Sequence, residues 1–188
     1  MAWSLLPAFA VALSACTINI NVPSNPGFGM MNSEPGGAGE VEMFAEMMIP
    51  HHQQAIDMSE LALERSSNPQ IRDLSQRIID GQTPEIELMS EWLPEGRRDL
   101  DMPLMGMSGM GGMASEEEMA ELNTLSGDNF DRQFLSLMIT HHEGALHMVH
   151  MIDDSNRDEV AQLARDITRV QTEEIDEMTR LLGEVPDA

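Results

Sequence analysis

A pattern that occurs twice restricts the fold of this chain more than any other feature. Residues 47–58 align with residues 137–148, and residues 82–93 align with residues 171–182. Each half carries the motif Met-x-x-His-His-x5-Met, followed by the motif Gln-x-x-Glu-Ile-x-x-Met. Because both motifs recur in the same order, we expect the two halves to be copies of one structural unit.

Helical periodicity of apolar residues extends from about residue 40 to the end of the chain, and no alternating run of β-branched residues competes with it. The fold is therefore predicted to be all-α. Long helices are expected at about 40–65, 69–93, 128–153 and 156–183, capped in the last three cases by Asn68, Asp128 and Asn156. A capping box at 115–118 predicts a short helix between the halves. Short loops within each half favour two duplicated helical hairpins, packed as a four-helix bundle over residues 41–188.

The N-terminus resembles a bacterial lipoprotein signal, because an apolar run over residues 5–15 ends in Leu-Ser-Ala before Cys16, the single cysteine of the chain. We expect residues 1–15 to be a signal peptide and Cys16 to be lipidated. Residues 16–40, rich in Pro, Gly, Ser and Asn, are expected to be a flexible tether. An exported lipoprotein of the cell membrane, facing the periplasm or the outside, follows from these expectations. The alternative is a cytosolic chain with an apolar N-terminal tail.

Composition narrows the classes of function. The net charge of −23, with ten Arg and no Lys, argues against nucleic acid as a partner. Eighteen Met, in a chain without Tyr, indicate a Met-rich core, Met ligands for a soft metal, or both. The sequence also lacks the Glu-x-x-His pairs of di-iron bundles, a Gly-rich phosphate loop and a nucleophile elbow, so we expect no enzymatic activity.

The paired histidines of each half and their flanking methionines lie on one helix face, because residues three and four apart are neighbours on a helix. That face also belongs to the core, where unpaired imidazoles are costly to bury. Imidazole and thioether are good ligands for a soft or borderline ion such as copper. The predicted metal ligands are Met48, His51, His52, Met58, Met138, His141, His142 and Met148. Gln82, Glu85, Met89, Gln171, Glu174 and Met178 on the second helices are expected to surround them.

The alternative is a packing role, in which the histidines only form hydrogen bonds to the Gln and Glu side chains and fix the register of the bundle. Two further groups of candidate ligands lie outside the repeat. Five methionines stand among Gly and Ser in a loop at 101–114, with nothing expected to pack against them: Met102, Met105, Met107, Met110 and Met113. This tract predicts a flexible copper(I) clamp, with a plain linker or an oxidation sink as alternatives. His147, His150 and Met151, near Glu143 and Asp154, predict an accessory, more exposed site that suits copper(II), or else a polar helix face.

The segments 48–58 and 82–93 resemble the signature of the bacterial domain of unknown function DUF305, and the likeness covers about residues 41–182. Members are exported, adopt a ferritin-like four-helix fold and include a cyanobacterial periplasmic copper-binding protein. The resemblance implies metal binding by the eight His and Met residues of the repeat, although Thr140 stands where the first copy has Pro50.

The resulting hypothesis is a copper-binding lipoprotein that acts without catalysis in copper sequestration, delivery or resistance at the cell envelope. Copper(I) is the favoured ion, with copper(II) as the second. The expected partners are the metal ion, the membrane through the lipid anchor alone, and a copper-handling protein. The alternatives are a structural or interaction module and a metal-dependent oxidoreductase.

Overall fold

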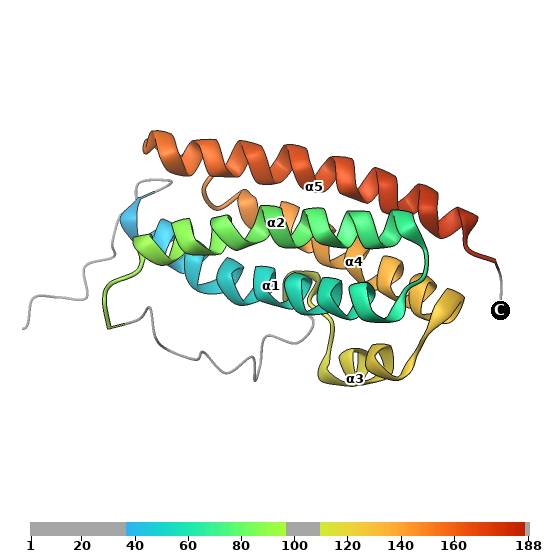
Figure 1. Cartoon of the computed structure of the whole chain (residues 1–188). Coiled ribbons are helices and arrows are strands. Elements are labelled where there is room, and N and C mark those ends of the chain that lie inside the picture. The colour runs from blue at the N-terminus through green and yellow to red at the C-terminus, as the bar shows by residue number, and fades with distance from the viewer. Residues whose placement is uncertain (1–36, 97–109, 187–188) are drawn as a thin grey trace, which may run out of the picture. The chain divides into compact units, whose positions relative to one another are not determined.

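The computed structural model describes residues 37–96 and 110–186 and contains five α-helices and one short 3-10 helix in this part of the chain (Figure 1). The elements are α1 (Ala38–Arg65), α2 (Pro69–Trp92), η1 (Met110–Gly112), α3 (Glu116–Thr124), α4 (Gly127–Val149) and α5 (Asp158–Glu184). No strand occurs in these residues, which confirms the all-α prediction. None of the described helices combines the length and the apolar character that a membrane span requires. The predicted signal peptide, Cys16, most of the tether and Met102, Met105 and Met107 lie outside the described residues.

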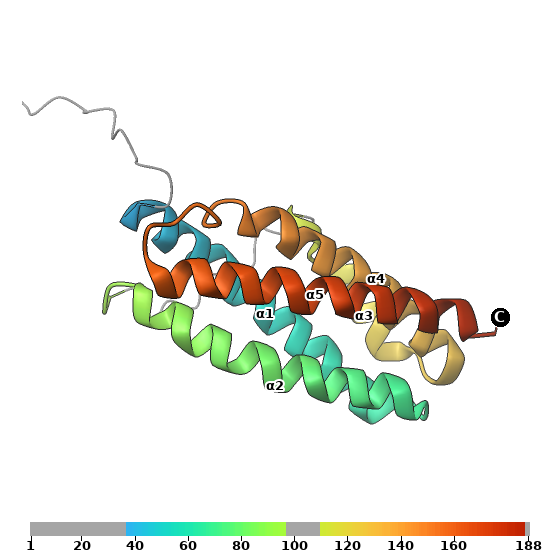
Figure 2. The ribbon, with the colours of Figure 1, turned by 90° about the horizontal axis from the view of Figure 1, so that it is seen from above.

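The four long helices pack as two pairs, each joined by a short connection (Figures 1 and 2). α1 packs against α2, and α4 packs against α5, with the two members of each pair running in opposite directions. The pairs meet mainly through α1 and α4, whereas α2 and α5 touch much less. The short helix α3 precedes α4 and packs against it.

Local sequence signals account for the starts of α2 and α3. The Asn68 side chain accepts a hydrogen bond from the Gln70 amide at 3.0 Å, and the capping box of Ser115 and Glu118 is complete, so both predicted caps are confirmed. The predicted Asp128 cap is wrong, because α4 already begins at Gly127, directly after Ser126. Gly127 itself has a left-handed φ of 58°, which glycine adopts readily. Asp128 instead lies in the first turn, where a carboxylate favours the helix dipole.

The junction between α4 and α5 also differs from the prediction. α4 ends at Val149 instead of near residue 153, because the amides of Met151 and Ile152 bond to carbonyls three residues earlier and tighten the chain into a turn. α5 begins at Asp158 after Arg157, so Asn156 is not its cap.

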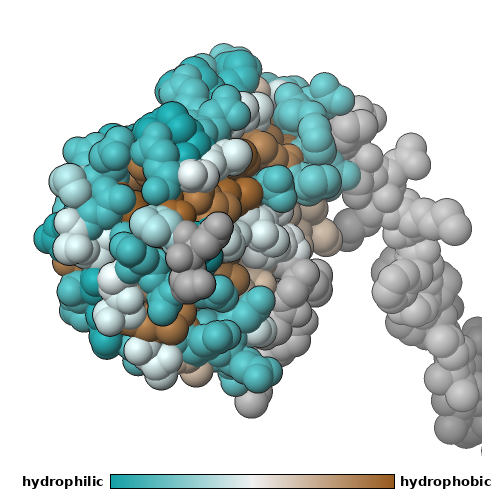
Figure 3. All heavy atoms as spheres, turned by 90° about the vertical axis from the view of Figure 1, so that its right-hand side faces the viewer, coloured by the Kyte–Doolittle hydropathy of each residue, from teal (hydrophilic) through white to brown (hydrophobic). Residues whose placement is uncertain are grey.

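The core consists of two hydrophobic clusters. One, the Phe130 cluster, contains Met58, Met138 and Met178 beside the stacked rings of Phe130 and Phe134, whose centroids are 6.0 Å apart. The other, the Phe44 cluster, contains Met48 and Met89, with Met148 packed against it. On α1 and on α4, the paired histidines stand in the sequence between a residue of one cluster and a residue of the other. The face at the end of the molecule near α3 is mostly hydrophilic, with hydrophobic side chains showing between the polar ones (Figure 3).

Candidate metal centre

The four paired histidines meet in the interior and form what we call the histidine layer: His51 and His52 from α1, and His141 and His142 from α4. Each residue is at most 1% exposed. The His51 and His141 rings face each other with centroids 3.7 Å apart and planes tilted by 35°. His52 lies 6.4 Å from His51, and His142 lies 6.2 Å from His141, so the four rings form a row across the two helix pairs. The prediction that each His pair lies on the core face of its helix agrees with this burial.

Two of the four rings are held by carboxylates of the second helices. His52 Nε2 lies 2.8 Å from Glu85 Oε2, and His142 Nε2 lies 2.8 Å from Glu174 Oε2. A carboxylate only accepts hydrogen bonds, so each Nε2 carries the proton. In the neutral ring this leaves a lone pair on Nδ1, and the Nδ1 atoms of both residues are buried without a hydrogen-bond partner. Such carboxylate–histidine pairs orient imidazoles in many metal sites.

The two central rings have weaker partners. His51 Nε2 donates to the Gly111 carbonyl at 2.8 Å and leaves its buried Nδ1 unpaired, while neither nitrogen of His141 has a hydrogen-bond partner. Burial lowers the pKa of His51 to about 3, although the Gly111 carbonyl opposes the effect. Burial also lowers the pKa of His141, and the neighbouring imidazoles lower it further. Both rings are therefore neutral near pH 7, and protons do not compete for their lone pairs.

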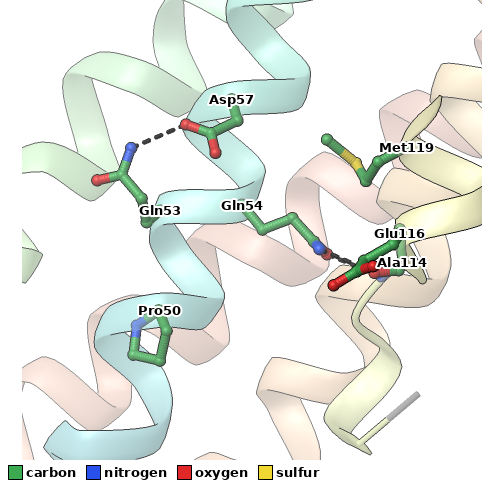
Figure 4. Close-up of a pocket in the computed structure, with 7 residues that line it drawn as sticks. All are labelled: Pro50, Gln53, Gln54, Asp57, Ala114, Glu116 and Met119. Carbon is green, nitrogen blue, oxygen red and sulfur yellow. Dashed lines mark hydrogen bonds between the residues drawn. The ribbon is translucent and has the colours of Figure 1, made fainter. Parts of the chain in front are cut away.

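A short strap, residues 110–114, covers His51. A Cβ at Gly144 of α4 would overlap the Gly111 carbonyl and lie 2.7 Å from the Gly112 nitrogen, so the strap rests directly on α4. The side-chain amide of Gln54 holds Ala114 from the other side, donating to its carbonyl at 2.9 Å and accepting from its amide at 2.7 Å (Figure 4). A hollow of about 340 Å³ lies beside this contact, but no histidine lines it, so it is not part of the histidine layer. The strap was not predicted from the sequence, because the contact that holds it depends on Gly144 and Gly111, which lie on two distant segments.

The strap includes the end of the Met/Gly tract. Met113 is only 4% exposed, so the expectation that the tract has nothing to pack against is wrong for this residue. A Cβ at Gly111 would lie 3.2 Å from the Met148 sulfur, which places this thioether next to the strap. Met110 begins η1.

The accessory cluster is divided by the end of α4. His147 lies on the helix and its Nδ1 bonds to the Glu143 carbonyl at 2.8 Å, whereas His150 lies just beyond the helix. The exposed His150 ring pairs with Asp153 at 3.1 Å, instead of with Asp154 as the helical spacing suggested. Met151 packs against the Phe44 cluster. The structure thus keeps both histidines at the surface, whereas Met151 packs against the core.

The glutamines of the repeat approach the layer from the second helices. Gln82 on α2 and Gln171 on α5 are 4% and 2% exposed and line the same small cleft as Glu85 and Glu174. Met89 and Met178 are fully buried in separate clusters. Within 37–96 and 110–186, no three His, Cys, Asp or Glu side chains are already arranged to hold one metal ion. The layer is therefore a set of unpaired nitrogen lone pairs and not a preformed cage, and ligation requires rings to turn or thioethers to join.

Comparison with known proteins gives relatives of this arrangement. A DUF305 fragment from Deinococcus radiodurans is 38% identical, with a TM-score of 0.69, and the match covers 80% of this chain and 99% of that chain. A candidate secreted protein of the same family from Streptomyces coelicolor is 36% identical, with a TM-score of 0.65 and coverage of 75% and 90%. CopM in its Cu(II)-bound form is 36% identical, with a TM-score of 0.66 and coverage of 77% and 96%. CopM has also been solved in Cu(I)-bound and Ag-bound forms.

No relative was found among curated proteins. The family model described as "Domain of unknown function (DUF305)" matches residues 42–182, which is most of the chain and includes both helix pairs. The chain therefore belongs to the DUF305 family.

Proposed function

We propose that this protein binds copper through the histidine layer and the methionines beside it. The observation that carries the proposal is the set of buried, unpaired nitrogens: Nδ1 of His51, His52 and His142, and both nitrogens of His141. A buried polar atom without a partner costs about 1–3 kcal/mol. Several such atoms on adjacent rings are therefore expected only where a ligand compensates for them.

The chemistry of the donors selects the ion. Neutral imidazole and thioether favour soft or borderline ions, and copper(I) accepts both. Met48 and Met148 on one side of the layer, and Met58 and Met138 on the other, supply thioethers within the same core. The similarity to CopM, which has been solved with copper and with silver, supports the same ligand class. Copper here is the cargo of a binding protein, and no residue is assigned a catalytic role.

The fold supports a finer proposal, a ferritin-like four-helix bundle built from two duplicated hairpins. Each core cluster combines methionines of both halves in a reciprocal way: Met48 and Met89 with Met148, and Met138 and Met178 with Met58. A twofold relation between duplicated hairpins produces this exchange.

The remaining expectations complete the proposed role. The exposed His147 and His150 suit copper(II), the Met tract suits copper(I), and lipidation at Cys16 would hold the protein at the cell envelope. There the protein would sequester copper, deliver it to a copper-handling partner, or confer resistance. The hydrogen bonds of His52 to Glu85 and of His142 to Glu174 also favour the alternative packing role.

One experiment separates the two roles. In a titration of the full chain with copper(I) against a competing chelator, we expect His51→Leu/His141→Leu to lose the tightest site, and the control His147→Ala/His150→Ala to keep it. We also expect the single variant His141→Leu to raise the free energy of unfolding without metal, because leucine removes two unpaired buried nitrogens. Equal copper affinity in all variants, together with a less stable His141→Leu protein, would favour the packing role instead.

A further inference from the structure

A small cleft between α2 and α5 leads toward the histidine layer. Its volume is about 50 Å³, which is room for one or two water molecules or for an ion that keeps little of its hydration shell. Paired positions of the repeat line it: Gln82 with Gln171, and Glu85 with Glu174. Two helices that otherwise touch little thus enclose a small space, in which these four polar side chains stand beside the apolar Ile78, Ile167 and Val170.

The cleft contains amide groups that nothing satisfies. Neither Nε2 nor Oε1 of Gln82 has a hydrogen-bond partner, and Oε1 of Gln171 also lacks one. Both side chains are more than nine-tenths buried. Leucine at these positions would fill a similar volume without leaving polar atoms unpaired, so a packing role does not explain two glutamines. Amide and carboxylate oxygens are donors that cations accept.

Two side chains connect the cleft with the histidine layer. Glu85 and Glu174 line the cleft, and each accepts a hydrogen bond from a buried histidine at 2.8 Å. An ion bound to either carboxylate would therefore be separated from an imidazole of the layer only by that carboxylate. Arg77, the basic residue of the cleft lining, is paired with Glu177 at 2.8 Å and with Asp73 at 3.1 Å, so its charge is compensated.

The opposite approach is closed in this structure. On that side the Gly111 carbonyl occupies His51 Nε2, and the contact of the strap with Gly144 leaves no space even for a methyl group. At Gly81, in contrast, an added Cβ would meet nothing within 4 Å, and this residue lines the cleft.

We propose that the α2/α5 cleft is the port by which a metal cation reaches the histidine layer, and that the Gln82 and Gln171 amides replace part of its hydration shell on the way. The proposal rests on the proposed function, since it gives the copper site its route. Such a port would admit a small, nearly dehydrated ion and exclude copper held in a bulky chelate.

The test follows silver(I), a redox-inert stand-in for copper(I), into the full chain by rapid mixing and chelator quench. The phase of silver uptake that is absent in His51→Leu/His141→Leu reports binding at the histidine layer, and the rate of this phase is compared between variants. We expect Gln82→Leu/Gln171→Leu to slow this phase by about tenfold or more, because the ion loses polar contacts while it sheds water. The final amount of bound silver should not change. The control, Gln76→Leu/Gln162→Leu, alters exposed glutamines on the same two helices and should leave the rate unchanged.

A second variant tests the route by size alone. Gly81→Phe adds a ring in the open space of the cleft and should also slow uptake, whereas Gly183→Phe, at an exposed and equally open site of α5, should not. Uptake at the wild-type rate in both cleft variants would overturn the port alone. Absence of silver uptake by the wild-type chain would overturn the proposed function and the port with it.

Discussion

Substitution of Gly144 by alanine should detach the strap from α4. A Cβ at this position would overlap the backbone carbonyl of Gly111, and neither backbone can move aside without breaking other contacts. The strap would have to lift, and the hydrogen bond from His51 Nε2 to Gly111 would be lost with it. The two bonds between Gln54 and Ala114 hold the next part of the strap and would be weakened.

The magnitude follows from these contacts. An unpaired buried imidazole donor costs about 1–3 kcal/mol, and each bond between Gln54 and Ala114 contributes about 1 kcal/mol. Alanine in a helix interior offsets about 1 kcal/mol of this loss relative to glycine. We therefore expect the free energy of unfolding to fall by about 2 kcal/mol, which for a domain of this size lowers the melting temperature by roughly 4–8 °C.

Thermal unfolding and amide exchange measure the effect together. The Ala114 amide, which donates to Gln54, should exchange slowly in the wild type and quickly in Gly144→Ala. Gly183→Ala is the matched control, because its Cβ meets nothing within 4 Å; it should be slightly stabilised with unchanged exchange at Ala114. A Gly144→Ala protein as stable as this control, with Ala114 still protected, would refute the placement of the strap.

Two further predictions concern the histidines and their partners. Because burial lowers the pKa of His51 to about 3, its ring takes up a proton on unfolding at any pH between about 3 and 6.5, so the free energy of unfolding should fall as the pH drops through this range. Relative to neutral pH, the free energy of unfolding that His51 contributes should fall by about 3 kcal/mol at pH 4, and this loss should be absent in His51→Leu. Urea unfolding at several pH values tests both expectations. Glu174→Leu should cost about 1–3 kcal/mol and Glu85→Leu less, because the Glu174 side chain is 7% exposed and that of Glu85 is 20% exposed. Equal losses in chemical denaturation would contradict this explanation.

Sequence periodicity predicted the helices well, because the signals for α1, α2 and α5 are local. The Asn68 cap and the Ser115 capping box depend on residues within one turn, and both were confirmed. The start of α4 was misplaced because an Asp such as Asp128 is favoured both as a cap and in the first turn of a helix. The end of α4 has no glycine or proline to mark it.

The sequence predicted which polar residues belong to the candidate site, but not how they are arranged. The repeat indicates that four histidines, two glutamates and two glutamines belong together, and these residues do meet in the interior. Their different partners could not be predicted: the two motif copies are alike, yet His51 bonds to Gly111 while the corresponding His141 has no partner. The strap that causes this difference lies between the halves and occurs once, so the repeat carries no information about it.

The methionine content and the absence of a preformed cage among the described residues have a common physical explanation. If the layer binds an ion as proposed, its tilted, unpaired imidazoles must turn or thioethers must join them, and a rigid core resists such movement. Methionine has three rotatable bonds and a polarizable sulfur, so it can follow a ring at low cost and can also become a ligand. Fully buried Met48, Met58 and Met138 flank the histidines in sequence, where branched or aromatic side chains would fix the rings in place. If the core binds copper as proposed, the same thioethers would serve both as ligands and as mobile side chains that let the rings turn.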